Sequence, residues 1–138
     1  MFLAQLFMQR EIMKNLMLFI GLGVIFSSFS HVDNATAIIN ALKVGNAGEV
    51  SKYFDNFIDL KLPEKDEIKN IGKNQAGIAF ESFFKDNGIK GFDLTSQRDM
   101  NGTMYLAGKL QNGGKGYSIT ILLKTKDANQ QVITLRIN

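Results

Sequence analysis

Few side chains of this protein are of the kinds that catalyse reactions, and one carboxylate stands out among them. Asp59 lies in the segment Ile58–Leu62, where apolar and polar residues alternate as on a half-buried strand. A carboxylate there would act as a general base if it faced a pocket and burial raised its pKa. Ile58 and Leu60 occupy the apolar face, so the alternation directs Asp59 to the opposite one. Which face lines a pocket stays open, and a solvated or structural carboxylate is the commoner case.

The remaining polar candidates are tyrosines and arginines on predicted packed elements. A tyrosine can carry a hydroxyl into a pocket, although packed tyrosines are more often core residues with one hydrogen-bonded hydroxyl. Arg98 and Arg136 lie on predicted strands and could bind an anion bidentately, whereas an ordinary ion pair is the commoner role. Two phenylalanines of a predicted helix are core residues that could also line a pocket. The candidate ligand-binding set is Tyr53, Phe80, Phe84, Arg98, Tyr105 and Tyr117.

Several classes of chemistry are excluded by composition. The single histidine, His31, lies at the start of the predicted mature chain, outside its core, which argues against histidine-dependent triads and metal sites. The absence of cysteine excludes disulfides, thiolate metal sites and a lipid-modified N-terminal cysteine. Gly113-Gly114 falls in a predicted hairpin and not between a strand and a helix, so it is no phosphate loop. We therefore expect neither a metal nor a cofactor.

The N-terminus has the organisation of an export signal. Met13-Lys14-Asn15 is a short basic region, Leu16–Phe26 is an apolar run, and Ser27–Ser30 supplies the small residues of a cleavage site. The run is shorter than the roughly 20 residues that span a bilayer. We expect translation to start at Met13, residues 1–30 to be removed, and residues 31–138 to form one domain. The product would be periplasmic or secreted, without a lipid anchor and without membrane association after cleavage.

The predicted mature chain carries a small, dispersed charge. Without residues 1–30 it keeps 14 Lys and Arg against 12 Asp and Glu, a net charge of +2. The lysines are spread along the chain and do not cluster, which argues against a nucleic-acid partner. Its phenylalanines, most of the 11 in the full sequence, are enough to build one core.

Helices dominate the first half. Ala35, Ile38, Ile39 and Leu42 recur at helical spacing, with Asp33 or Asn34 as N-cap and Gly45 as the stop. A helical turn follows, in which Ala47, Val50 and Phe54 share a face. Pro63 ends the strand that holds Asp59, and residues 64–74 read as a connecting loop with room for one short strand. A third helix runs from Gln75 to the Asn87-Gly88 cap.

Strands joined by tight turns fill the second half. Asn101-Gly102 and Asn112-Gly113-Gly114 separate the strands Gly91–Met100, Thr103–Gln111 and Tyr117–Lys126, and Asp127-Ala128-Asn129 precedes the last one. On that last strand we expect Ile133, Leu135 and Ile137 to share one face. Leu122 interrupts the alternation of its strand, which indicates that both faces there are partly covered. This order predicts an α+β domain with three helices packed on one face of a curved antiparallel sheet.

The chain resembles a bacterial domain-of-unknown-function family of exported proteins in the nuclear-transport-factor-2-like superfamily, which has a cystatin-like fold. The residues that carry this resemblance are Gly45-Asn46-Ala47, Tyr53-Phe54-Asp55, Ile58-Asp59-Leu60, Gln75-Ala76, Phe83-Phe84, Phe92, Tyr105, Gly108-Lys109-Leu110 and Tyr117. It covers residues 34–138 and implies a cone of curved sheet closed by helices. Where the family usually has serine at the start of the third helix, this chain has Gly72-Lys73-Asn74-Gln75, a weaker N-cap.

The resemblance leaves several functions open, because this superfamily includes isomerases, dehydratases and non-catalytic modules. We expect an exported non-catalytic module that binds a small apolar ligand or a protein partner. The alternative is a small cofactor-independent isomerase- or dehydratase-like enzyme, since such enzymes often place their general base near the position of Asp59. Leu122, Ala107 and Tyr105 put apolar area on the sheet face away from the helices, so we also expect association through that face, as a homodimer or with another protein. The alternative is a monomer, because single exposed apolar residues are common.

Overall fold

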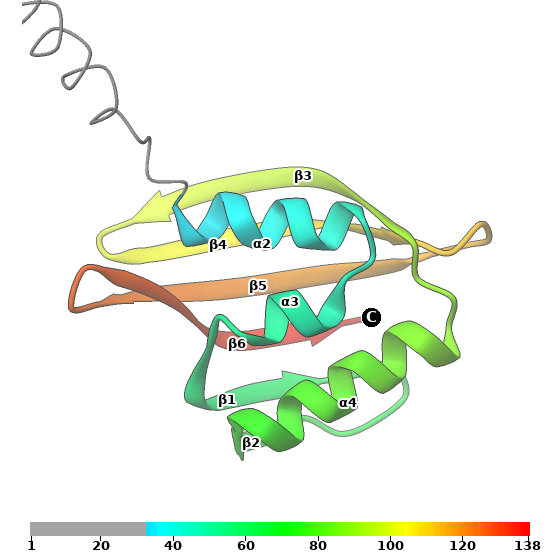
Figure 1. Ribbon diagram of the computed structural model, residues 1–138, viewed down its shortest axis with the longest axis horizontal. Helices are drawn as coiled ribbons and strands as arrows, with labels where there is room; N and C mark the ends of the chain where they lie inside the picture. Colours follow the sequence, from blue (N-terminus) through cyan, green and yellow to red (C-terminus); the bar gives the residue numbers. More distant parts are fainter. Residues whose placement is uncertain (1–32) are drawn as a thin grey trace, which may run out of the picture. The chain divides into compact units, whose positions relative to one another are not determined.

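The computed structural model describes residues 33–138, which form an α+β unit with a curved, open sheet (Figure 1). The predicted export signal and His31 lie outside the described residues. The helices are α2 (Asn34–Lys43), α3 (Ala47–Ser51) and α4 (Lys73–Asp86). The strands are β1 (Phe54–Lys61), β2 (Ile68–Gly72), β3 (Gly91–Met100), β4 (Thr103–Gln111), β5 (Tyr117–Lys126) and β6 (Asn129–Ile137).

Helix α2 begins and ends as its sequence predicts. A side-chain oxygen of Asp33 accepts a 2.7 Å hydrogen bond from the backbone N–H of Thr36 and caps the helix. Hydrogen bonds from Thr36 also hold the pKa of Asp33 below its usual value. After the helix, Gly45 has a φ of +71°, and a Cβ there would lie 2.8 Å from the carbonyl oxygen of Ile89. Glycine therefore meets both a conformational and a steric need at this turn.

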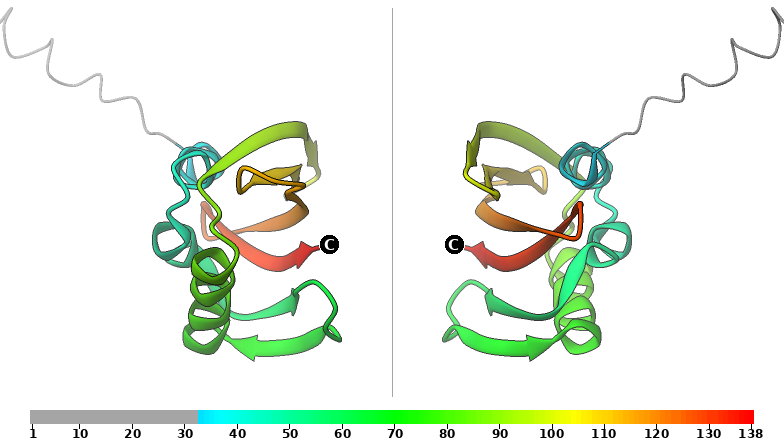
Figure 2. Two further views of the ribbon diagram at one scale, coloured as in Figure 1. Left: turned by 90° about the vertical axis from the view of Figure 1, so that its right-hand side faces the viewer. Right: turned by 90° about the vertical axis from the view of Figure 1, so that its left-hand side faces the viewer.

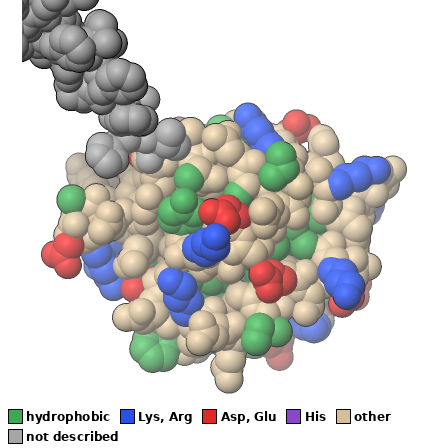
Figure 3. Space-filling model, viewed as in Figure 1, with side chains coloured by type: hydrophobic (Ala, Val, Ile, Leu, Met, Phe, Trp, Pro, Cys, Tyr) green, Lys and Arg blue, Asp and Glu red, His purple; other side chains and the backbone are tan. Residues whose placement is uncertain are grey.

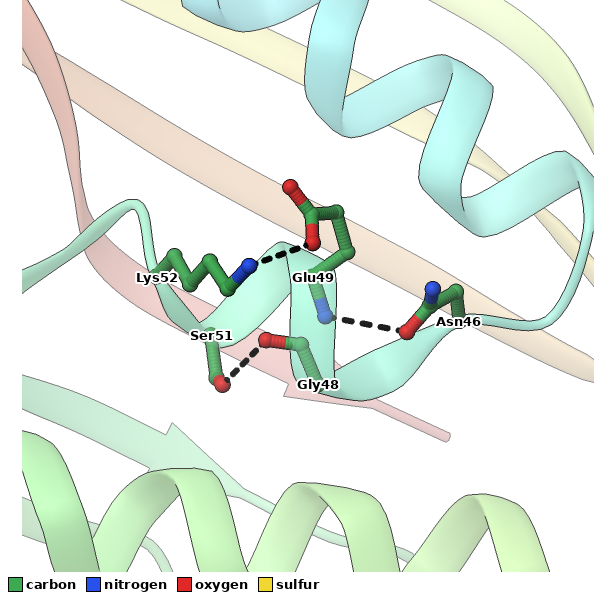
Figure 4. Close-up of polar contacts among 5 residues, drawn as sticks. All are labelled: Asn46, Gly48, Glu49, Ser51 and Lys52. Carbon is green, nitrogen blue, oxygen red and sulfur yellow. Dashed lines mark hydrogen bonds and ion pairs between the residues drawn. The ribbon is translucent and has the colours of Figure 1, made fainter.

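The short helix α3 depends on local polar contacts (Figure 4). The side-chain oxygen of Asn46 accepts from the backbone N–H of Glu49 at 3.0 Å, and the Ser51 hydroxyl donates to the Gly48 carbonyl at 2.8 Å. Lys52 and Glu49 form an exposed ion pair at 2.8 Å. These contacts suit a helix too short to be stable by itself. Phe54, predicted on the same helical face, instead begins β1, where it is fully buried.

The sheet has the strand order β2-β1-β6-β5-β4-β3, and one of its pairings is parallel. We expected only antiparallel pairing, and four of the five strand pairs follow that expectation. The exception is β1 with β6, where Asp59 pairs with Thr134 and Leu60 with Leu135. Neighbouring strands in a hairpin must run in opposite directions, whereas β1 and β6 are joined by the long connection of residues 62–128 and are free to run parallel.

Strand β6 departs from simple alternation. We predicted that Ile133, Leu135 and Ile137 share one face, but Val132, Leu135 and Ile137 are fully buried and Ile133 is only half-buried. The pairing explains this error. Leu122 pairs with Thr134 while Leu123 pairs with Val132, so Ile133 is the extra residue of a β-bulge. A bulge shifts the two-residue alternation by one position, and this shift puts Val132 into the core.

The segment between β1 and α4 is more regular than a loop. It contains β2, which pairs with β1 and forms the edge of the sheet. Helix α4 begins at Lys73, two residues before the predicted start, with Gly72 at the N-cap position. Gly72 makes no side-chain capping bond, in agreement with the weak cap that its sequence predicts.

Helices α2, α3 and α4 lie on the same side of the sheet, as the two side views show (Figure 2). The space between helices and sheet is filled by apolar side chains. Phe80 is fully buried, and its ring centroid lies 5.8 Å from that of Phe54 and 4.5 Å from that of Phe84. Gly108 of β4 leaves room for the ring of Phe92, because a Cβ at this glycine would collide with that ring. This close packing makes the interior a core.

Candidate functional site

The structure divides the predicted site residues between the two faces of the sheet. Phe80 and Phe84 are buried in the interior, and Tyr53 and Tyr117 are partly buried against the same core. Asp59, Arg98 and Tyr105 lie on the opposite face, which we call the open face because α2, α3 and α4 all pack on the other side. The predicted ligand-binding set is thus not one site.

On the open face, one row of paired residues crosses five strands. The pairs are Arg98 with Tyr105, Tyr105 with Leu122, Leu122 with Thr134, and Thr134 with Asp59. Side chains of directly paired residues point to the same face, so these residues form a continuous cross-strand row. Strands lie about 4.8 Å apart, which puts the two ends of the row roughly 19 Å from each other. Asp59 and Arg98 therefore do not converge on one small ligand.

The centre of the row is uncharged and shielded by its own neighbours. Tyr105 and Leu122 are only partly exposed, and Thr134 is 9 % exposed although no described helix covers this face. Ala107 and Thr120 are paired with each other beside the row and are also partly buried. The sequence predicted that Leu122, Ala107 and Tyr105 lie on this face. It did not predict the same for Thr134, because the position of Thr134 depends on the bulge in β6.

Charged side chains stand at the two ends of the row. Arg98 is exposed and forms no ion pair within residues 33–138. Asp59 uses one carboxylate oxygen to accept a 2.9 Å hydrogen bond from the backbone N–H of Asn70 in β2. A neutral centre with charged ends is the pattern of many protein interfaces.

Two further ion pairs tie elements together outside the row. Arg136 of β6 contacts Glu67 at 2.8 Å. Asp55 of β1 contacts Lys126 at the end of β5, and the hydrogen bond from Lys126 lowers the pKa of Asp55. Both pairs join positions about 70 residues apart in the sequence and stabilise long-range pairing.

A cleft of about 340 Å³ lies at the C-terminal end of α4. Its wall includes Tyr117, whose hydroxyl donates to the side-chain oxygen of Asn87 at 2.9 Å. The Asn87 amide in turn donates to the Phe83 carbonyl at 2.9 Å, and the Tyr117 ring meets the Phe83 ring edge to face at 5.1 Å. The tyrosine hydroxyl thus helps to cap the helix. The volume is at the lower limit for ligand sites. The sequence predicted Asn87 as a helix cap. No pattern in the sequence indicated that Ser82 and Asp86 would line the same cleft.

The helix-bearing face is mixed in charge. Basic and acidic side chains are interspersed there and do not gather into a patch of one sign (Figure 3). Two apolar residues are exposed there: Val44, the C-cap of α2, and Ile78 of α4.

Within residues 33–138, no cluster of three His, Asp or Glu side chains has the arrangement of a metal site. The described helices also include none with the length and apolar character needed to cross a membrane.

Known proteins resemble this chain in sequence and in fold. A family model described as a domain of unknown function, DUF4783, matches residues 35–138. Among solved structures, a DUF4783 family protein from Bacteroides ovatus has a TM-score of 0.68 and 25% identity, with 73% of this chain and 90% of that chain covered. No curated protein matches the sequence.

More distant structures share the fold alone. A nuclear-transport-factor-2-like protein of unknown function from Cytophaga hutchinsonii has a TM-score of 0.54 at 12% identity, covering 80% of this chain and 92% of that one. An uncharacterised cystatin-fold protein from Novosphingobium aromaticivorans has a TM-score of 0.57 at 10% identity, covering 78% and 98%. The architecture predicted from the resemblance in sequence is therefore confirmed at the level of an open, curved-sheet α+β fold of this type.

Proposed function

Since the chain belongs to the DUF4783 family of domains of unknown function, we propose from its geometry that it is an exported, non-catalytic association module that pairs with a second copy through the open face. The observation that carries this proposal is the contrast between the two faces of the sheet. One is closed by a filled core, and the other presents an uncharged, half-buried strip between charged ends.

The filled interior supports association over ligand capture. Phe54, Phe80 and Phe84 occupy the space between helices and sheet in which a pocket would lie. The polar residue buried in the described part, Thr134, belongs to the open face. Asp59 also lies there, so the alternative of an enzyme that uses Asp59 as a pocket carboxylate gains no support from the geometry. A small ligand would instead have to use a surface cleft, such as the one beside Tyr117.

The open face supports pairing of sheets. Tyr105, Ala107 and Leu122 give it an apolar centre with an aromatic residue, a composition favoured at protein interfaces. Two sheets packed face to face lie about 10 Å apart, a distance that side chains of this size can fill. Export of the module rests on the basic and apolar pattern of residues 13–30.

Sedimentation tests the proposal. The protein purified from the full reading frame should sediment as a dimer at micromolar concentration. Leu122→Lys should make it monomeric, because a charge would stand at the centre of the interface. Ile78→Lys is the matched control, since Ile78 is 66% exposed on the helix-bearing face, and it should leave the dimer intact. A monomeric wild-type protein, or equal association of the two variants, would contradict self-association through this face.

A further inference from the structure

We propose that the two copies meet with their two-fold axis parallel to β5, so that Arg98 of each copy faces Asp59 of the other. This inference rests on the proposed self-association and specifies its geometry. It follows from the order of residues along the cross-strand row.

The row is symmetric in position about β5. Leu122 lies at its middle, Tyr105 and Thr134 lie one strand away on either side, and Arg98 and Asp59 lie two strands away. The ends are thus equally distant from the centre, about 10 Å each, but opposite in charge. A surface with this arrangement is complementary to a copy of itself turned end for end.

Symmetry allows two simple arrangements, and charge distinguishes them. In a face-to-face dimer the two-fold axis lies in the plane of the interface. An axis along the strands exchanges the ends of the row and sets Arg98 of one copy over Asp59 of the other. An axis across the strands keeps the ends in place, which sets Arg98 over Arg98 and Asp59 over Asp59. Opposite charges attract and like charges repel, so the charges at the two ends of the row favour the axis along β5.

Exposed apolar residues give the same answer independently. Met100 follows Arg98 by two residues on β3, and Phe57 precedes Asp59 by two residues on β1; they are 50% and 57% exposed. Strands β3 and β1 run in opposite directions, so both residues are displaced to the same side of the row. The axis along β5 therefore brings the Met100 end of one copy to the Phe57 end of the other. The other axis would set Met100 over the polar Ser96.

Both charged groups keep capacity for a partner. Arg98 has no ion pair within the described chain, and its side chain presents several donors. Asp59 accepts one backbone bond through one oxygen, and its other carboxylate oxygen has no partner among residues 33–138. Pairing between copies would thus use groups that folding leaves available.

Charge reversal tests this arrangement in the full-length protein. Arg98→Asp alone sets carboxylates against each other at both ends of the interface, and Asp59→Arg alone sets guanidinium groups against each other. Each variant should associate at least about tenfold more weakly than the wild type. An equimolar mixture of the two should associate as a heterodimer about as tightly as the wild type, because both contacts between positions 98 and 59 then join opposite charges. The double variant Arg98→Asp/Asp59→Arg should regain the homodimer affinity of the wild type. This result would also show that the substitutions leave the fold intact.

The outcomes separate this inference from the proposed function. A dimeric wild type and a monomeric Leu122→Lys variant would support association through the open face. If the mixture and the double variant then associate as weakly as the single variants, the axis along β5 is wrong, but association through the open face stands. Single variants that associate as tightly as the wild type overturn the axis in the same way. A monomeric wild type overturns both the association and its geometry. Sedimentation equilibrium with one variant fluorescently labelled distinguishes heterodimers from homodimers.

Discussion

Truncating Phe80 to alanine tests the claim that the interior is a core and not a pocket. Phe80 is fully buried and contacts two aromatic rings, Phe54 and Phe84. Phenylalanine-to-alanine changes in packed cores cost about 3 to 5 kcal/mol. Aromatic pairs add about 0.5 to 1.5 kcal/mol each beyond burial. We therefore expect a loss near the upper end, about 4 to 5 kcal/mol, from a domain stability of about 5 to 15 kcal/mol.

Urea unfolding followed by circular dichroism measures this loss. With an m-value of about 2 kcal/mol/M, the unfolding midpoint should fall by about 2 M. The matched control is Ile78→Ala on the same helix, where the side chain is 66% exposed and the change should stay within about 0.5 kcal/mol. If Phe80→Ala leaves too little folded protein to measure, Phe80→Leu should lose roughly half as much.

A small effect would refute the reasoning. A loss below about 2 kcal/mol with an unchanged m-value would mean that the surroundings of Phe80 are loosely packed. The interior would then have room for a ligand, and the main support for a non-catalytic association module would be lost.

The remaining predictions concern packing, titration and export. Gly108→Ala should destabilise the domain by about 1 to 3 kcal/mol, a fall of at least about 4 °C in Tm, because the new methyl group would collide with the backbone carbonyl oxygen of Asp93 and with the ring of Phe92; an unchanged Tm would show that both the backbone and the ring move aside freely. The Asp55 contribution to stability should be full above the ordinary carboxyl pKa and be lost as pH falls through its lowered folded pKa. In Lys126→Gln, NMR titration should find the pKa of Asp55 close to its ordinary value, and no rise would exclude the ion pair as the cause. N-terminal sequencing of exported protein should find cleavage within two residues of Ser30, and an intact N-terminus would contradict export with removal of a leader.

Local signals in the sequence predicted most elements of the fold. The Asp33 cap set the start of α2, and the turn at Asn101-Gly102 has positive φ at both residues, as its dipeptide predicts. The bulge at Ile133 was not predictable, because an extra residue in one strand appears only in its pairing with the next. The parallel pairing of β1 with β6 was missed for a similar reason, since no local pattern encodes which distant strands meet.

The candidate site was predicted residue by residue but not as an arrangement. Asp59, Arg98 and Tyr105 were each named from the sequence, and the apolar character of Leu122 indicated a covered second face. Their common row depends on the register of four strand pairs, and each register follows from turn lengths and bulges along the chain. Alternation alone gives the face of a residue but not its neighbours across the sheet.

The pairing of β1 with β6 has a consequence for when the protein can fold. Strand β1 obtains its inner neighbour only from β6, whose residues follow those of β1 by about 75 positions in the sequence. While the chain is being made, β1, β2 and α4 have no sheet on which to pack, because the edge they join does not yet exist. Closing such a distant contact costs chain entropy before any gain in burial, which slows folding. The part of the domain formed by β1, β2 and α4 therefore completes its packing only after β6 has been made, although the hairpins of β3, β4 and β5 can pair earlier.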